Sequence, residues 1–407
     1  MNNAPELRFK SFTTPWVNTR LGDIAFFKSG NTPSKNNSSF WGGDYPWISA
    51  SSMHSHSFGS SEYTLTEGGL KAAKVAKNGT LLLLVRGSML FNKIPVGIAT
   101  RKVAFNQDVK AINTSEVTSS NFLLLWFLAQ ENRLLNMVTG TGIGAGKLDT
   151  DELKGLPFVY PEDRKEQQKI ADFLTSVDTK ISQLTEKHRL LKEYKKGVMQ
   201  QVFSQQIRFK DEDGKAFPEW KEFLFSDIAQ FSKGKGISKS DIVENGKTPC
   251  IRYGELYTIY GEVINSISSY TNVETNSLIL SEINDVILPC SGETQIDIAT
   301  ASCVMLPNVA YSGDLTIVKS KINGIFLSYF LNSAKKTTIA ALSQGSSVIH
   351  LYASHLKTMK LTVPTSKEEQ QKIAQFLQSI DQKIDAVTKQ IDQTKQFKKG
   401  LLQQMFV

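Results

Sequence analysis

The sequence Glu166-Gln167-Gln168-Lys169-Ile170-Ala171 occurs a second time as Glu369-Gln370-Gln371-Lys372-Ile373-Ala374, 203 residues later. Between residues 166 and 203, 20 of the 38 aligned pairs are identical without a gap. The repeat extends upstream more faintly, because Ala104–Asp108 aligns with Ala310–Asp314, and Arg8-Phe9-Lys10 with Arg208-Phe209-Lys210. A repeat of this length indicates a tandem duplication, in which each copy has a variable globular part followed by a better preserved tail.

The preserved tail is predicted to form one long helix in each copy. Residues 162–204 contain no proline and one glycine, and they are rich in Lys, Glu, Gln and Leu, which favour helix. Apolar residues recur at alternating steps of four and three, which is the spacing of a coiled-coil seam. The predicted seam residues are Ile170, Leu174, Val177, Ile181, Leu184 and Leu191 in the first copy, and Ile373, Leu377, Ile380, Ile384, Val387 and Ile391 in the second.

The two helices are predicted to pack against each other. A rod of about 43 residues is ~60 Å long and must bury its apolar stripe. If a pseudo-twofold axis relates the two copies, as in a dimer fused into one chain, the helices form an antiparallel coiled coil. The alternative is that each helix packs only on its own globular part. Lys195 and Lys398 interrupt the two seams at the same site.

The globular parts read as α+β domains. Each contains short β-rich runs (81–85 and 281–289), an apolar helix (122–128 and 325–331), and loops rich in Gly, Ser, Asn and Thr. We therefore expect residues 1–161 as the first domain, 162–206 as the central helix, 207–364 as the second domain and 365–407 as the C-terminal helix.

Two glycine-rich loops are candidates for nucleic-acid contact. The first runs from Ser29 to Asn37 and leads into an aromatic stretch from Trp41 to Ser49; the second is Lys233-Gly234-Lys235-Gly236-Ile237-Ser238-Lys239. Small hydrogen-bonding side chains with basic residues can follow phosphates and reach base edges. The candidate DNA-binding residues are Ser29, Asn31, Thr32, Ser34, Lys35, Asn36, Trp47, Ser49, Arg86 and Lys147 in the first copy, and Lys233, Lys235, Ser238, Lys239, Arg252 and Tyr253 in the second.

Charge alone does not identify a partner. The formal net charge is +8, and it divides into +5 for residues 1–161, +2 for 162–204, −1 for 205–366 and +2 for 367–407. The second globular part is therefore not basic overall, and any phosphate contacts there must come from local clusters. Three cysteines without CxxC spacing fit a reducing cytosol, and no apolar run approaches the ~20 residues of a membrane span.

No catalytic motif is recognisable. The glycine-rich run 140–147 lacks the first glycine and the Ser/Thr of a phosphate-binding P-loop, and we expect a flexible hinge there. His54 and His56 have no accompanying Cys or His cluster, which argues against a metal site. The nuclease-like Glu152-Leu153-Lys154 is absent from the second copy, and no two prolines are adjacent, as amino-methyltransferases require.

The duplicated helices and the segments Gly30-Asn31-Thr32-Pro33-Ser34-Lys35-Asn36-Asn37 and Trp41–Ser49 resemble the specificity subunits of Type I restriction–modification systems. The resemblance implies two target-recognition domains, each reading one half of an asymmetric bipartite site in double-stranded DNA. It implies that the helix pair sets the spacer and docks two methylation subunits, and that restriction and translocation subunits join the complex. S-adenosylmethionine, ATP and Mg²⁺ would belong to those partners, with no cofactor or metal in this chain, no enzymatic activity of its own, no membrane and a cytoplasmic location.

Two other hypotheses remain open from the sequence. The chain could be a single-chain DNA-modifying enzyme with an unrecognised site, which would modify or cut DNA when purified alone. It could also be a coiled-coil adaptor that binds only protein, in which case neither globular part would bind a duplex.

Overall fold

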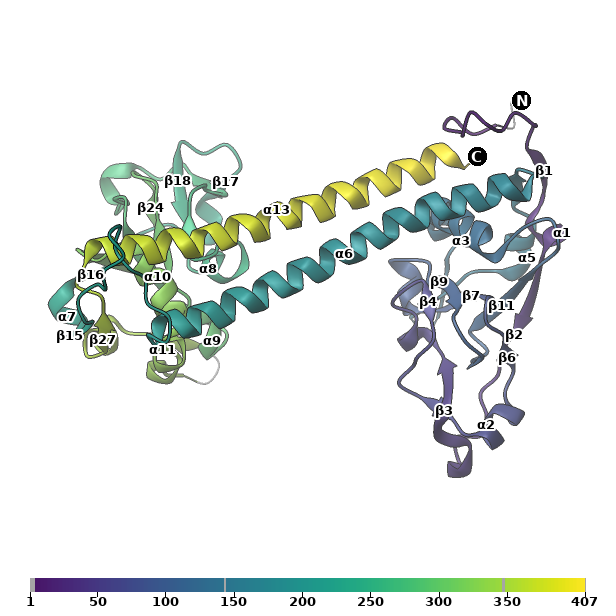
Figure 1. Cartoon of the computed structure of the whole chain (residues 1–407), viewed down its shortest axis with the longest axis horizontal. Coiled ribbons are helices and arrows are strands. Elements are labelled where there is room, and N and C mark those ends of the chain that lie inside the picture. The colour runs from purple at the N-terminus through teal and green to yellow at the C-terminus, as the bar shows by residue number, and fades with distance from the viewer. Residues whose placement is uncertain (1–3, 143, 346–347, 407) are drawn as a thin grey trace. The chain divides into compact units, whose positions relative to one another are not determined.

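The computed structural model describes residues 4–142, 144–345 and 348–406, and the chain divides into two compact units. The first unit is Met1–Thr185 with Lys389–Val407, and the second is Glu186–Thr388. The two long helices, α6 (Arg164–Phe203) and α13 (Lys367–Met405), each contribute one half to each unit (Figure 1). Each unit is therefore a globular part completed by two antiparallel half-helices.

The first unit is built on a five-stranded sheet with a smaller four-stranded sheet beside it. β7 (Leu81–Leu84) is the central strand of the five-stranded sheet. All four of its leucines are fully buried in the core of the unit, so both faces of the sheet are covered at this strand, because successive side chains point to opposite faces. Helix α3 (Ser120–Ala129) packs against β9 of this sheet. In order, the sheets are β2 (Ala25–Ser29), β11 (Val109–Thr114), β7 (Leu81–Leu84), β9 (Val96–Ala99), β4 (Ser57–Phe58); β5 (Thr64–Leu65), β3 (Trp41–Ile48), β10 (Val103–Phe105), β6 (Val75–Ala76); β12 (Thr139–Thr141), β13 (Ala145–Lys147), β8 (Arg86–Gly87); and β1 (Val17–Arg20) with β14 (Pro157–Tyr160). The shorter helices are α1 (Leu21–Ile24), α2 (Glu67–Ala72), α4 (Glu131–Asn136) and α5 (Thr150–Lys154), with 3₁₀ turns η1 (Ser38–Phe40), η2 (Ala50–Ser52) and η3 (Ser88–Phe91).

The second unit repeats this plan. Its five-stranded sheet has the same order of equivalent strands, and helix α10 (Gly324–Ser333) packs on β21 and β23. The sheets are β16 (Ala229–Lys233), β25 (Leu315–Ser320), β21 (Asp285–Pro289), β23 (Ser302–Val304), β19 (Val263–Ile264); β17 (Ile242–Val243), β20 (Ser269–Thr271), β18 (Thr248–Ile251), β24 (Ala310–Tyr311); β22 (Ser291–Gly292) with β26 (Ile349–His350); and β15 (Lys221–Leu224) with β27 (Lys360–Val363). The shorter helices are α7 (Phe225–Ile228), α8 (Glu255–Thr258), α9 (Gln295–Ile298), α11 (Lys336–Leu342) and α12 (Ala353–Lys357), with 3₁₀ turns η4 (Lys239–Asp241) and η5 (Thr275–Ser277). The predicted α+β class and internal duplication are confirmed.

The two long helices pack together in both units, as predicted. In the first unit the start of α6, with Ile170, Leu174 and Val177, shares one core with the end of α13, with Leu401 and Met405. In the second unit the end of α6, with Val198, Met199, Val202 and Phe203, shares a core with the start of α13, with Ile373, Leu377, Ile380 and Ile384. Both cores also include residues of the globular parts. Packing of the helices on each other and packing of each helix on a globular part, which were alternatives from the sequence, therefore occur together. Of the remaining predicted seam positions, Leu184, Val387 and Ile391 are buried, and Ile181 and Leu191 are half-buried.

The repeated Glu-Gln pair anchors the start of each long helix. Glu166 and Glu369 are 1 % and 0 % exposed, and each carboxylate accepts from a tryptophan indole, Trp16 at 3.2 Å and Trp220 at 3.1 Å. Arg8 forms an ion pair with Glu166, and Arg208 forms one with Glu369. The next residues, Gln167 and Gln370, each donate at 2.8 Å to the carbonyl of the proline before the helix, Pro161 and Pro364. A buried carboxylate is costly unless it is paired, so these partners must be present in both copies.

The seam lysines form reciprocal ion pairs. Lys195 Nζ lies 2.7 Å from Asp381 Oδ1 in the second unit, and Lys398 Nζ lies 2.7 Å from Asp178 Oδ1 in the first. Both lysines and both aspartates are separated by the repeat offset of 203 residues. Each pair joins α6 to α13, so the same contact is made twice with the roles of the helices exchanged.

The expectation of a flexible hinge at residues 140–147 is wrong for the part of this run that the structure describes. Thr139–Thr141 and Ala145–Lys147 form a β-hairpin, and β13 also pairs with β8. An added Cβ at Gly146 would lie 2.8 Å from Val138 Cγ1, which shows how closely the hairpin is packed. Position 143 of the run lies outside the described residues.

Candidate nucleic-acid interface

The two glycine loops occupy equivalent places in the two units. After β2, the amide of Asn31 donates to the carbonyl of Phe105 at 3.0 Å, and after β16 the amide of Lys235 donates to the carbonyl of Tyr311 at 3.0 Å. Phe105 and Tyr311 end the equivalent strands β10 and β24. The structure therefore places the two loops as the repeat predicts, although only the second has a second glycine, Gly236, where the first has Thr32.

The first glycine of each loop is required by a close backbone approach. A Cβ on Gly30 would lie 2.2 Å from the carbonyl oxygen of Phe105, and a Cβ on Gly234 would lie 2.0 Å from that of Ser312. No side chain fits at such distances. Each loop is thus pinned to the turn that joins β10 to β11 or β24 to β25.

Several predicted residues of the first loop hold its shape. Asn31 Nδ2 donates to the carbonyl of Ala72 at 2.9 Å, and Thr32 Oγ1 donates to Gln107 Oε1 at 2.8 Å. Trp47 is only 6 % exposed, and its indole donates to the carbonyl of Asn31 at 3.3 Å, so it supports the loop from beneath. Its ring also meets the ring of Trp41 edge-on, with centroids 5.3 Å apart.

The remaining first-unit candidates lie at the surface. Ser29, Ser34, Lys35, Asn36 and Arg86 are exposed, and Ser49 is half-buried. Within the described residues, Lys35 has no hydrogen-bond or ion-pair partner, which leaves its ammonium group available to a ligand.

Arg86 and Lys147 form a basic pair on neighbouring strands. They are directly opposite each other between β8 and β13, although Lys147 also contacts Asp149 at 3.0 Å. The pair is absent from the second unit, where Ser291 and His350 occupy the equivalent positions opposite each other.

The cross-strand pair at the end of the strand before each loop contains one lysine in both units. Ser29 lies opposite Lys110 between β2 and β11, and Lys233 lies opposite Thr316 between β16 and β25. The lysine is on the second strand of the pair in the first unit and on the first strand in the second unit, and a hydroxyl residue, Ser29 or Thr316, lies opposite it. The positive charge is therefore kept at the same cross-strand pair. Lys110 could not be recognised as a candidate from the sequence, because only the strand register reveals its relation to Lys233.

Four other candidate residues of the second unit, two from the second loop and two that follow β18, lie around one hollow. Ser238, Lys239, Arg252 and Tyr253 line a hollow of about 860 Å³, together with Asp314 and other residues. The hydroxyl of Ser238 already makes a hydrogen bond within this segment, because its Oγ donates to Asp241 Oδ2 at 2.7 Å. Lys235, in contrast, is exposed beside this loop and does not line the hollow.

An exposed apolar side chain occurs at one matched position of the two units. Phe91 is 52 % exposed and Ile296 is 54 % exposed. Phe91 and Ile296 are equivalent because the strands on either side of them align without a gap. Leu82 pairs with Gly97 in the first unit, and the equivalent Ile287 pairs with Ser302 in the second. Sequence analysis missed this pair because the loops around it share no residues. Its equivalence becomes visible only through the paired strands.

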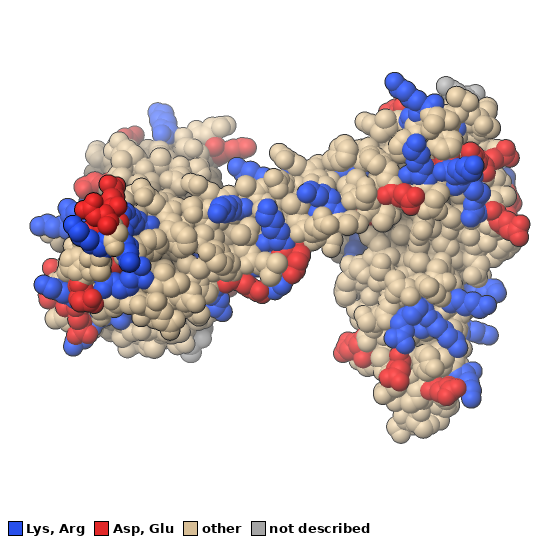
Figure 2. All heavy atoms as spheres, in the orientation of Figure 1, with Lys and Arg blue, Asp and Glu red and all other residues tan. Residues whose placement is uncertain are grey.

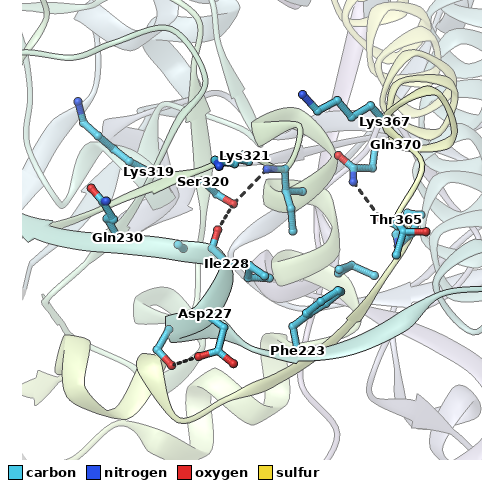
Figure 3. Close-up of a pocket in the computed structure, with 15 residues that line it drawn as sticks. Phe223, Asp227, Ile228, Gln230, Lys319, Ser320, Lys321, Thr365, Lys367 and Gln370 are labelled. Atoms are coloured by element: carbon cyan, nitrogen blue, oxygen red, sulfur yellow. Dashed lines mark hydrogen bonds between the residues drawn. The ribbon is translucent and has the colours of Figure 1, made fainter.

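A second hollow, of about 690 Å³, lies at the start of α13 in the second unit (Figure 3). Figure 3 shows Lys319, Lys321 and Lys367 around it, while Ser320 and Gln370 are held by hydrogen bonds to neighbouring backbone carbonyls. Lys319 is paired with Glu282 at 2.5 Å. On the face drawn in Figure 2, acidic and basic side chains are interspersed over each unit and no extended basic surface is seen there.

The described residues contain no group of three or more His, Cys, Asp or Glu side chains that could hold a metal ion. Burial raises the pKa of the Cys250 thiol to about 11 and that of Cys303 to about 12, so neither is a thiolate at neutral pH. Among the described helices, none is both long and apolar enough to cross a membrane.

Comparison with known proteins identifies the repeated unit. The model of the Type I restriction modification DNA specificity domain matches residues 14–193 and again residues 218–396. The specificity subunit of the MjaIX Type I restriction enzyme from Methanocaldococcus jannaschii is 24 % identical over 406 residues, covering 95 % of this chain and 91 % of that subunit. The EcoR124I/EcoR124II specificity subunit from Escherichia coli is 29 % identical over 183 residues, which are 44 % of this chain and 45 % of that subunit.

A solved structure shows the same fold over the whole chain. The Type I restriction–modification S subunit from M. genitalium superimposes with a TM-score of 0.60 at 17 % identity, covering 99 % of both chains. Specificity subunits are non-catalytic components of their complexes. Because the family domain matches twice and together these matches span most of the sequence, the chain belongs to the Type I restriction modification DNA specificity domain family.

Proposed function

We propose that this chain is the DNA-specificity subunit of a Type I restriction–modification complex and that its two globular parts, residues 1–161 and 207–364, read different halves of one bipartite site. The observation that carries the proposal is that one family domain occurs twice on one architecture with different loop residues. Two identical domains related by a twofold would require a palindrome, whereas two different domains require two different half-sites.

The helix pair has the properties of a spacer. Residues 162–206 and 365–407 carry two long helices that pack in both units, and the reciprocal Lys–Asp pairs hold them in one register. A polar pair at a seam position specifies register and orientation. The helices would also dock two methylation subunits, and restriction and translocation subunits would complete the cytoplasmic complex. S-adenosylmethionine, ATP and Mg²⁺ would bind to those partners.

Within each domain, the glycine loop and its cations form the proposed contact surface. Ser29, Ser34, Lys35, Asn36, Ser49, Arg86 and Lys147 contribute in the first domain, and Lys233, Lys235, Ser238, Lys239, Arg252 and Tyr253 in the second. Asn31, Thr32 and Trp47 position the first loop through their hydrogen bonds.

Sequencing the methylated sites in cells that carry the complete system tests bipartite reading. We expect one asymmetric site with two specified halves and an unspecified spacer. A palindromic or continuous site would contradict the assignment of one domain to each half.

Lys35 and Lys239 offer a matched test of phosphate binding, because both are exposed and follow the equivalent serines of the two loops. Changing either to Ala should weaken binding of the assembled complex to any duplex and lower the salt slope by about 0.9 for each phosphate that is no longer neutralised. Lys360→Ala is the control, since this lysine forms an exposed pair with Glu222. An unchanged slope for both loop variants would exclude phosphate binding by these two lysines.

A further inference from the structure

The most constrained basic side chain at the hollow of about 860 Å³ in the second unit is Arg252. It follows β18, lines this hollow, and its side chain is 29 % exposed. Its Nε donates to Glu255 Oε1 at 3.0 Å and its Nη2 lies 2.9 Å from the same oxygen. No contact engages Nη1 within the described residues, so this part of the guanidinium remains open to a ligand.

Glu255 is itself fixed from several directions. It is 3 % exposed, Ser269 Oγ donates to Oε1 at 2.6 Å, and the backbone amide of Arg252 donates to Oε2 at 3.0 Å. A carboxylate held in this way restricts the guanidinium to one orientation before any ligand arrives. Pre-organisation reduces the entropy lost when a ligand is bound.

A second observation points to a polar ligand in the same hollow. Ser312, 3 % exposed, lines it, and its buried Oγ has no hydrogen-bond partner among the described residues. Buried hydroxyls are normally satisfied, so the Ser312 hydroxyl can still make one hydrogen bond at the wall of the hollow that Arg252 also lines.

The hollow also contains acceptors. The carboxylates of Asp314 and Glu293 line it beside Arg252, and both residues are exposed. In the major groove a G·C pair presents the O6 and N7 acceptors of guanine and the N4 donor of cytosine. A fixed arginine with nearby carboxylates matches this pattern, whereas an A·T pair would place an N6 amino group against the guanidinium.

Resting on the function proposed above, we propose that Arg252 reads a guanine in the half-site of the second domain and that Glu255 is its positioning residue. The first domain does not share this device. Strand pairing aligns Trp47 and Ile48 with Cys250 and Ile251, so Ser49 occupies the position of Arg252 and Ser52 that of Glu255. The two half-sites would therefore differ at this point.

The test uses the full chain assembled with its methylation subunits and a duplex carrying the site found by sequencing. Each guanine of the second half-site is replaced in turn by 7-deazaguanine, which lacks the N7 acceptor. The unaltered complex should lose about 10-fold in affinity at one such position. Arg252→Ala should bind the normal site about 10- to 100-fold more weakly and should no longer respond to that replacement.

Two further variants separate reading from folding. Glu255→Gln keeps the shape of the side chain but removes its charge, and it should weaken binding while reducing the response to the same 7-deazaguanine. Lys360→Ala, in the same unit, should behave as the unaltered chain. Circular dichroism melts of all variants check that the second unit is folded, and Arg252→Gln replaces Arg252→Ala if the latter is unfolded.

The outcomes are distinguishable. If the Arg252 variants respond to every replacement as the unaltered complex does, or if the second half-site contains no G·C pair, the assignment to Arg252 is overturned while the bipartite function stands. If the unaltered complex shows no site-specific binding at all, the proposed function fails as well.

Discussion

Individual side chains explain why the Glu-Gln-Gln-Lys-Ile-Ala motif occurs twice. Glu166 and Glu369 are buried carboxylates, and each is satisfied by one tryptophan and one arginine that lie between 149 and 161 residues earlier in the chain. The Arg-Phe-Lys sequence at residues 8–10 and 208–210 is therefore part of the same device. The phenylalanine of this sequence also packs on the long helix in both copies, since the Phe9 ring contacts the Phe173 ring and the Phe209 ring contacts the Phe376 ring.

The seam lysines allow a matched prediction of stability. Lys195→Met leaves Asp381 and Glu262 without their counter-charge in a site where the lysine is 13 % and the aspartate 28 % exposed. We expect a loss of about 2–3 kcal/mol in the free energy of unfolding, below the ~3–5 kcal/mol of a fully buried pair because solvent screens this one. Lys398→Met should cost about 1 kcal/mol, because its partner Asp178 is 46 % exposed. Urea unfolding measures both.

The loss in free energy of unfolding caused by Lys195→Met, called the deficit below, should depend on pH. Burial already raises the pKa of Asp381 above its ordinary value, against the lowering effect of Lys195, and loss of that lysine raises it further. A group whose pKa is higher in the folded state stabilises the fold below that pKa and loses this contribution as pH rises through it. The deficit should therefore shrink on acidification, and Asp381→Asn combined with Lys195→Met should remove the part of this dependence that comes from Asp381, leaving only the part from Glu262. A deficit that grows on acidification would contradict this account.

Among the elements, the long helices were the most predictable from sequence. Their alternating four- and three-residue steps indicate a buried stripe directly. Helix α6 (Arg164–Phe203) begins two residues after and ends three residues before the expected bounds of 162–206, and α13 (Lys367–Met405) lies two residues inside the expected bounds of 365–407. The periodicity is visible in the sequence because successive turns of each helix bury the same apolar stripe.

The two glycine loops were predictable only in outline. Gly30 and Gly234 could be aligned, but the support that Trp47 gives and the clamp of Glu255 on Arg252 depend on side chains brought together by the fold. The hairpin at 139–147 was missed because glycine-rich sequence is compatible with both a hinge and a tightly packed strand, and packing against Val138 decides between them.

The helices offer a prediction at the scale of the element. Removing residues 184–190 and 387–393 deletes one heptad from each helix and leaves all four residues of the reciprocal ion pairs in place. The rods should shorten by ~10 Å, and the spacer of the methylated site by about three base pairs. Sequencing of methylated sites measures the spacer.

Deletion of the heptad from α6 alone is the control. It keeps the heptad phase of α6 but makes this helix seven residues shorter than α13, so the two reciprocal Lys–Asp pairs can no longer both form, and the melting temperature should fall. A complex with both helices shortened that methylates sites of the original spacing would contradict the role of the helices as a ruler.

At the scale of the whole molecule, the two units make the same terminal contact in different ways. In the first unit the amide of Leu7 donates to the carbonyl of Gln404 at 2.9 Å, and in the second the amide of Ile207 donates to that of Gln201 at 3.1 Å. Gln201 and Gln404 are equivalent in the repeat. One contact bridges residues from opposite ends of the sequence, and the other lies within a short turn.

This equivalence predicts that the chain tolerates circular permutation. Joining Val407 to Met1 through a short Gly-Ser linker and opening the chain between Ser204 and Gln205 should preserve the folded structure and DNA binding, since Leu7 already lies beside Gln404 and the opened bond follows the exposed Ser204 just after α6. Melting curves and binding measurements with the assembled complex check this. A permutant opened between Leu82 and Leu83, inside the buried strand β7, is the control and should not fold. Failure of the first permutant to fold would contradict the equivalence.

The division into units also has a consequence for synthesis on the ribosome. The second unit is one continuous stretch, Glu186–Thr388, whereas the core of the first includes Leu401, Leu402, Met405 and Phe406. The first unit therefore cannot complete its core until the residues of the C-terminal half of α13 have been synthesised. Until then its apolar helix surface stays exposed, a condition in which chains aggregate or recruit chaperones. The half of the protein that is translated first is the half that can be completed only last.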